Sequence, residues 1–159
     1  MNTEILECDY SDPEHLNAVV RLLNAYIADE MGGGAPLSKR DELHLVDGLN
    51  SHPTAIVLLA RTGDTFSGML VAFGNFATFT AKPMINIHDL IVLKEFRTQG
   101  IGRRLMNAVI RKAEATGCSR LTLEVRNDNV IAQQLYKELG FGETDPEMYY
   151  WRLELKTKN

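Results

Sequence analysis

The residues whose types and spacing best suit chemistry form one glycine-rich turn. In chain order they are Arg97, Thr98, Gln99, Gly100, Ile101 and Gly102. An apolar run at 90–93 precedes the turn and an amphipathic run over 103–116 follows it, which predicts a strand, a turn and a helix. The first N–H groups of a helix lack intrahelical partners, and the helix dipole adds partial positive charge there. Gly100 and Gly102 carry no Cβ, so a bulky anion can approach the backbone of the turn closely. The turn therefore suits a phosphate or pyrophosphate, although it can also be only a tight connection between strand and helix.

The elements that must position this turn follow from the hydrophobic pattern. Strands are predicted over residues 3–8, 55–61, 66–79, 85–93, 120–125 and 148–155, and helices over 13–31, 39–49, 103–116 and 130–139. Lys82-Pro83 is expected to interrupt the strand pattern, and a hairpin turn is expected at 62–65. The predicted fold class is α+β (mixed α/β), with a central mixed, mostly antiparallel sheet and about four flanking helices. We expect a single domain over residues 1–159.

Composition narrows the class of protein. The chain has 159 residues, of which 45% are hydrophobic and 24% charged, as in an ordinary globular domain. The net charge of −4 argues against general nucleic-acid binding and fits cationic small molecules better. No apolar run is long enough to span a membrane, and acidic residues come too early for a signal peptide. Two cysteines, Cys8 and Cys118, suggest a reducing compartment, so a cytoplasmic location is expected.

The second half of the chain contains the run Leu90-Ile91-Val92, the glycine-rich turn, the spaced residues Asn129, Ala132, Leu135 and Tyr136, and then Gly140-Phe141. Through these motifs it resembles the GNAT superfamily of acyl-CoA-dependent N-acetyltransferases. A narrower resemblance, through the two N-terminal helices and the segments 75–79 and 85–90, is to the diamine, spermidine/spermine and thialysine branch. The resemblance implies the GNAT acyl-CoA acyltransferase fold and acetyl-CoA as co-substrate.

The resemblance also implies where acetyl-CoA binds. Backbone amides from Thr98 to Arg103 would hold the pyrophosphate, and Arg97 and Arg103 either add charge or only face solvent. The strand residues Leu90, Ile91 and Val92 would pair with the pantetheine amides as a neighbouring strand does. In the family this strand splays from its neighbour where the thioester enters. Asn129 would hydrogen-bond the co-substrate, or else it only caps a helix.

The implied reaction is direct attack of an amine on the acetyl carbonyl in a ternary complex. Tyr136 is the candidate acid for the departing thiolate, although helical spacing also allows a core role for its ring. For the base we prefer His88, at a position where related members carry a carboxylate, and place Asp89 second. Strand alternation sends these two side chains to opposite faces unless a bulge intervenes. His88 also suits a substrate contact or a purely structural role.

The acceptor amine is expected near the end of the first helix. Asp29 and Glu30 would hold ammonium groups and Tyr26 would stack on the substrate, unless the three are only a polar helix end. A small cationic amine such as a polyamine, diamine or lysine analogue is expected. The alternatives are a protein lysine or N-terminus, or a non-catalytic acyl-CoA sensor. No metal is expected, because the histidines lack ligand spacing. The aromatic run at 148–151 suits a homodimer interface as well as a core or edge strand.

Overall fold

The computed structural model describes residues 1–157. Lys158 and Asn159, the end of the chain's polar tail, lie outside the described residues. The chain divides into two compact units, Met1–Leu123 and Glu124–Asn159, and each is described by itself. The expectation of a single domain over residues 1–159 therefore stays a prediction.

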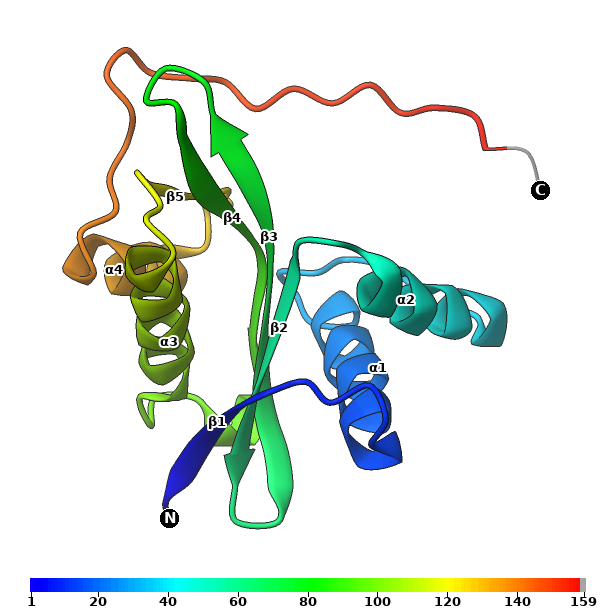
Figure 1. Ribbon diagram of the computed structural model, residues 1–159. Coiled ribbons are helices and arrows are strands. Elements are labelled where there is room, and N and C mark those ends of the chain that lie inside the picture. The colour runs from blue at the N-terminus through cyan, green and yellow to red at the C-terminus, as the bar shows by residue number, and fades with distance from the viewer. Residues whose placement is uncertain (158–159) are drawn as a thin grey trace. The chain divides into compact units, whose positions relative to one another are not determined.

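The first unit is built on one five-stranded sheet in the order β1-β2-β3-β4-β5 (Figure 1). The strands are β1 (Thr3–Glu7), β2 (Ala55–Thr62), β3 (Thr65–Ala77), β4 (Lys82–Val92) and β5 (Leu121–Leu123). The three pairs from β1 to β4 are antiparallel, and β5 lies parallel to β4. The predicted mixed, mostly antiparallel sheet is therefore confirmed, with the hairpin between β2 and β3 turning at 62–65 as expected.

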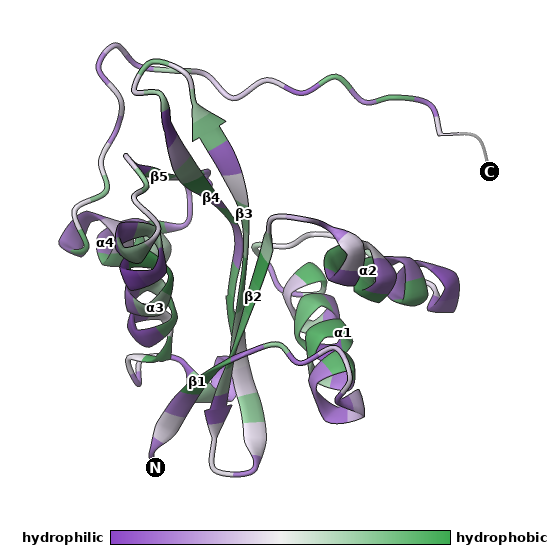
Figure 2. Ribbon diagram, viewed as in Figure 1, coloured by the Kyte–Doolittle hydropathy of each residue, from purple (hydrophilic) through white to green (hydrophobic). Residues whose placement is uncertain are grey.

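Helices cover both faces of this sheet. The helices of the first unit are α1 (Pro13–Ile27), α2 (Lys39–Ser51) and α3 (Ile101–Ala115), and the second unit contains α4 (Val130–Glu138). Helices α1 and α2 lie on one face and α3 lies on the other (Figure 1). The core on the α1 side is apolar, as the colouring along the central strands also shows (Figure 2). It includes Val19, Leu22, Val57, Leu59, Met69, Val71 and Ile91.

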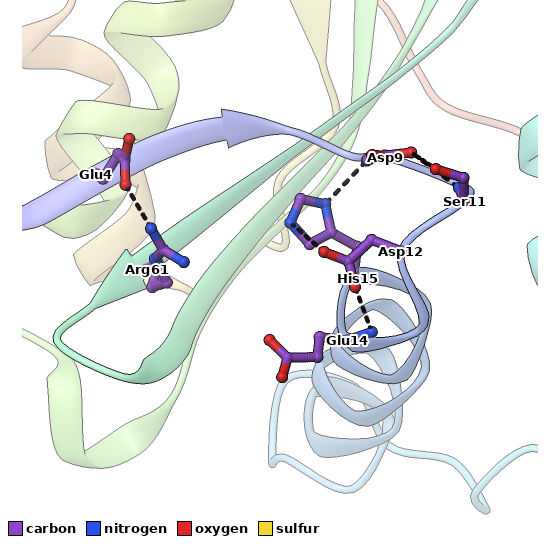
Figure 3. A network of polar contacts seen from close by, with 7 residues as sticks. All are labelled: Glu4, Asp9, Ser11, Asp12, Glu14, His15 and Arg61. Atoms are coloured by element: carbon purple, nitrogen blue, oxygen red, sulfur yellow. Dashed lines mark hydrogen bonds and ion pairs between the residues drawn. The ribbon is translucent and has the colours of Figure 1, made fainter.

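Polar side chains define where α1 begins and ends. Asp12 caps its start by accepting from the N–H of Glu14 at 2.8 Å, and Pro13 takes the first helical position (Figure 3). The helix was expected to run to residue 31, but it ends at Ile27. The reason is a turn in which the carbonyl of Asp29 accepts from two glycine N–H groups, at 2.9 and 3.1 Å. This turn takes over the backbone bonds that the helix would have continued.

Two other expectations about strands are wrong. Pro83 does not interrupt the sheet, because it lies near the start of β4, where its missing N–H costs little, and its carbonyl accepts from Ser119 N at 2.9 Å. Residues 148–155 form no strand, and their large apolar side chains are 68–86% exposed. Alternation of apolar and polar residues allows a strand, but a strand also needs a partner edge.

Candidate active site

The glycine-rich turn connects β4 to α3 through a short 3₁₀ helix, Lys94–Phe96. Two residues of the turn are left-handed, Thr98 with φ 62° and Gly100 with φ 78°. A β-branched residue seldom adopts this conformation, so the strain at Thr98 marks a backbone held in place by its surroundings. The bond from Arg104 N to Gly100 O, 3.0 Å long, is the first of α3, and the first helical turn has no acidic residue. The first N–H groups of a helix lack intrahelical acceptors, so the start of α3 is a place where an anion can bind.

β4 has an open edge just before this turn. Its pairing with β3 continues to Val92, whereas its pairing with β5 covers only the three residues from Ile85 to Ile87. Within Met1–Leu123, residues 88–92 therefore have a strand neighbour on one side only. This open stretch is about 17 Å long, at ~3.3 Å per residue. The predicted pantetheine-binding residues Leu90, Ile91 and Val92 all lie on it.

A β-bulge at His88 changes which face the candidate bases occupy. Ile87 pairs with Ala72 and Asp89 pairs with Val71, so His88 is an extra residue in β4. Asp89 shares the face of its partner Val71, which is the α1 side. Alternation alone had sent the two candidate bases to opposite faces.

The ring of His88 lies on that same face. It meets the edge of Phe73 with 4.8 Å between ring centroids, and Phe73 packs against the α1-side core. Phe73 in turn contacts the ring of His52 at 4.7 Å. The bulge therefore brings His88 and Asp89 together on the α1 side.

The two candidate bases have different surroundings. Burial raises the pKa of Asp89 above its ordinary value, and the neighbouring charge of His88 opposes part of that rise. His88 is exposed, and its ring makes an edge-to-face contact with Phe73. A carboxylate whose pKa lies closer to neutrality is a better proton acceptor than an ordinary one.

The three predicted acceptor residues have different surroundings. Asp29 is paired, because its Oδ2 accepts from Arg97 Nη2 at 2.7 Å, and its pKa is lowered mainly by that hydrogen bond. Tyr26 packs at the border of the α1-side core, and Glu30 is exposed. The structure thus joins one predicted acceptor residue to one predicted CoA-binding residue.

The remaining predicted residues belong to the second unit. Asn129 caps α4, its Oδ1 accepting from Ala132 N at 3.2 Å. Tyr136 is half-buried, with its ring centroid 6.1 Å from that of Phe141. Their contribution to one site with the glycine-rich turn stays a prediction.

One residue that positions the turn was missed by reasoning from the sequence. A glycine at position 68, inside a predicted strand, suggests a bend or a bulge, and it does border a bulge between β2 and β3. A Cβ on Gly68 would also lie 2.8 Å from the carbonyl oxygen of Ile91 and 3.3 Å from side-chain atoms of Ile101 and Leu105. Gly68 therefore allows the start of α3 to approach the sheet closely. The signal in the sequence was a glycine inside an otherwise apolar strand.

A hollow in the first unit lies apart from this site. An apolar hollow of about 450 Å³ is lined by the far end of β3 and the start of β4, including Phe76 and Met84, and by the last turns of α3. Within residues 1–157, no three His, Cys, Asp or Glu side chains gather as metal ligands do. No helix in that range is both long and apolar enough to cross a bilayer.

Comparison with known proteins decides the family. The model of the acetyltransferase (GNAT) family matches residues 19–141, more than half of the chain. This chain belongs to the GNAT acetyltransferase family. It is thus an acetyl-CoA-dependent N-acetyltransferase, and its five-stranded mixed sheet with four helices is the GNAT fold. The resemblance drawn from the sequence is confirmed.

Three relatives show the range of GNAT proteins that this chain is similar to. Uncharacterized N-acetyltransferase YhfO of Bacillus subtilis is 28% identical over 139 residues, covering 84% of this chain and 87% of that protein. Thialysine N-epsilon-acetyltransferase of Mus musculus is 27% identical over 147 residues, covering 87% and 84%. Aminoglycoside N(6')-acetyltransferase type 1 of Salmonella typhimurium is 25% identical over 121 residues, covering 69% and 79%.

A solved structure agrees with the GNAT fold. The crystal structure of a probable acetyltransferase superposes with a TM-score of 0.81 at 21% identity, covering 99% of this chain and 100% of that one. At this identity the likeness concerns the fold alone.

Proposed function

We propose that this GNAT enzyme transfers the acetyl group of acetyl-CoA to a primary amine on a small cationic molecule. The observation that carries the proposal is the open edge of β4, which leads through a short 3₁₀ helix and the glycine-rich turn to the N-terminus of α3. An extended ligand can pair with such an edge as a strand would. Its phosphates would then reach the N–H groups of the glycine-rich turn, residues 98–103. Pantetheine carries amides and CoA carries a pyrophosphate, so the two features suit the two parts of one ligand.

The reaction needs a base that takes a proton from the amine and an acid that gives a proton to the departing thiolate. The amine nitrogen bonds to the acetyl carbon, the carbon–sulfur bond breaks, and the sulfur leaves with the electron pair. Asp89 takes the proton that the amine loses, directly or through a water molecule, because burial raises its pKa and makes it a better proton acceptor than an ordinary carboxylate. His88, exposed beside it, contacts the substrate. Tyr136 donates a proton to the departing thiolate.

The acceptor would lie near the end of α1. The half-buried ring of Tyr26 and the exposed carboxylate of Glu30 lie near the end of α1, and the net charge of −4 favours a cationic partner. Two relatives are named for small molecules that carry amino groups, an aminoglycoside and thialysine. These features support a polyamine, a diamine or a lysine analogue as substrate.

The test is an acceptor panel with acetyl-CoA. It contains spermidine, a diamine, thialysine, an aminoglycoside, a peptide with an N-terminal alanine and a peptide with an internal lysine. Release of CoA thiol and the mass of the product are measured for each. We expect turnover on at least one small polyamine or lysine analogue well above that on either peptide. Turnover on a peptide alone would replace the proposed substrate class, and tight CoA binding without turnover on any amine would support a sensor.

We also propose that the protein is a homodimer. The observation behind this is the segment 148–155, where Trp151 and Leu153 are 86% and 85% exposed and alternate with charged Arg152 and Glu154. Such alternation is typical of a strand that pairs along one edge and packs on one face. A second copy of the chain offers the same segment, so that a two-fold contact can bury both.

A further inference from the structure

The carboxylate of Asp29 joins two segments that lie far apart in the sequence. Its Oδ2 accepts from Arg97 Nη2 at 2.7 Å, across 68 residues. Its Oδ1 accepts from the N–H of Met31 at 3.2 Å, and its carbonyl accepts from Gly32 and Gly33. The same residue thus closes the turn after α1 and contacts the segment before α3.

Arg97 extends this connection to the end of β4. Its Nε donates to the carbonyl of Val92 at 3.0 Å, while Nη2 is held by Asp29. The two donors come from one planar guanidinium, so their directions are linked. The next residue, Thr98, is the strained left-handed residue of the turn. Fixing Arg97 therefore also limits the backbone at the point where the turn enters its left-handed conformation.

The carboxylate of this pair is more buried than that of a comparable surface pair. The side chain of Asp29 is only 21% exposed, and Arg97 is 46% exposed. A comparable pair elsewhere in the first unit, Arg61 with Glu4 at 2.9 Å, is 44% and 55% exposed and joins neighbouring strands (Figure 3). The Asp29 pair instead links two loops from distant parts of the chain.

We propose that Asp29 is a positioning residue that couples the glycine-rich turn to the segment 29–36, so that CoA binding at the turn orders that segment. The inference rests on the proposed function, because it takes CoA to bind at residues 98–103. The coupling is reciprocal. If CoA raises the affinity for a ligand that orders segment 29–36, that ligand must raise the affinity for CoA by the same factor. Asp29 then acts through Arg97, while Tyr26 and Glu30 remain the groups offered to the amine.

The experiment measures hydrogen exchange with and without CoA in the full chain and in three variants. We expect CoA to slow exchange of the wild-type backbone both at 98–104 and at 29–36. In Asp29→Asn and in Arg97→Gln, protection at 98–104 should remain and protection at 29–36 should be lost. Calorimetry should show CoA affinity two- to five-fold weaker, about what a partly exposed ion pair contributes. Arg61→Gln is the matched control and should behave as the wild type does.

The outcomes separate this inference from the proposed function. If CoA binds without protecting 98–104, the location of the CoA site is wrong. If 98–104 is protected but 29–36 is not, or if both variants keep protection at 29–36, only the coupling is wrong. A rise in the KM of the amine for Asp29→Asn that Arg97→Gln does not share would instead make Asp29 a direct amine contact.

Discussion

Asp89 is the residue whose surroundings bear most directly on the chemistry. It lies half-buried beside an exposed histidine at a bulge, and burial raises its pKa. In the free enzyme Asp89 must be ionised to accept a proton, so activity should fall as the pH drops through its pKa. His88, when charged, lowers that pKa. The acid limb of the pH–rate profile therefore reports on both residues.

Substitutions at these two positions should move the acid limb in different ways. Asp89→Asn removes the base, so kcat/KM should fall by about 10²-fold or more and the limb should disappear. His88→Ala removes a positive neighbour, so the pKa of Asp89 and the acid limb should move to higher pH, with a lower plateau because a substrate contact is lost. The measurement is kcat/KM across pH 5 to 9. Loss of the limb in His88→Ala, with the limb intact in Asp89→Asn, would make His88 the base.

Tyr136 offers a second test at the scale of single residues. Tyr136→Phe keeps the ring, which packs near Phe141, and removes only the hydroxyl. We expect kcat to fall by about 10²-fold while the Kd of CoA stays within two-fold, because a proton donor acts in the transition state. Single-turnover rates and calorimetry measure the two quantities. An unchanged single-turnover rate would exclude Tyr136 as the acid.

At the scale of elements, the close contact of α3 with the sheet decides where the N–H groups proposed to bind the CoA pyrophosphate lie. Gly68 makes that contact possible, since a Cβ there would lie too close to the carbonyl oxygen of Ile91. The end of β5 pairing at Ile87 has the complementary effect, because it leaves the adjoining edge of β4 open. The absence of a side chain at Gly68 on β3 and the open edge of β4 beyond Ile87 thus affect the same end of the sheet, where α3 begins.

Gly68→Ala should separate these contributions. The added methyl group must displace β4 or α3, which should lower the free energy of unfolding by about 1–3 kcal/mol. It should also weaken CoA binding by about ten-fold, the loss of roughly one charge-assisted hydrogen bond. Denaturant unfolding and calorimetry measure the two effects.

Gly48→Ala is the matched control for this substitution. Gly48 lies inside α2 with open space where a Cβ would go. The change should raise stability by about 0.5–1 kcal/mol and leave CoA binding unchanged. Full CoA affinity in Gly68→Ala would mean that the position of α3 does not limit binding.

At the scale of the whole molecule, the exposed C-terminal segment 148–155 is the feature that favours association with a second copy. A run of large apolar side chains open to water over residues 148–155 is unusual for a monomer. The expected strand there did not form within the chain, although its alternation is suitable for pairing. Association of two copies satisfies both observations.

Truncation after residue 147 tests this association. The shortened chain should sediment as a monomer, whereas the full chain should sediment as a dimer whose fraction falls on dilution. CoA binding should be retained in the shortened chain, because the glycine-rich turn and β4 are unchanged. Trp151→Ser with Leu153→Ser is the milder variant and should shift the equilibrium in the same direction. A full chain that is monomeric at every concentration would contradict the homodimer.

The sequence by itself determined the features that depend on near neighbours. Hydrophobic period predicted the helices and five of the strands. Asn129 was a possible helix cap, and the glycine-rich turn with the Tyr136 helix indicated the family. Only the tertiary structure decided the bulge at His88, the open edge beyond Ile87 and the pairing of Asp29 with Arg97. Propensity and capping act within a few residues of the chain, whereas strand register and ion pairs depend on partners that only folding brings together.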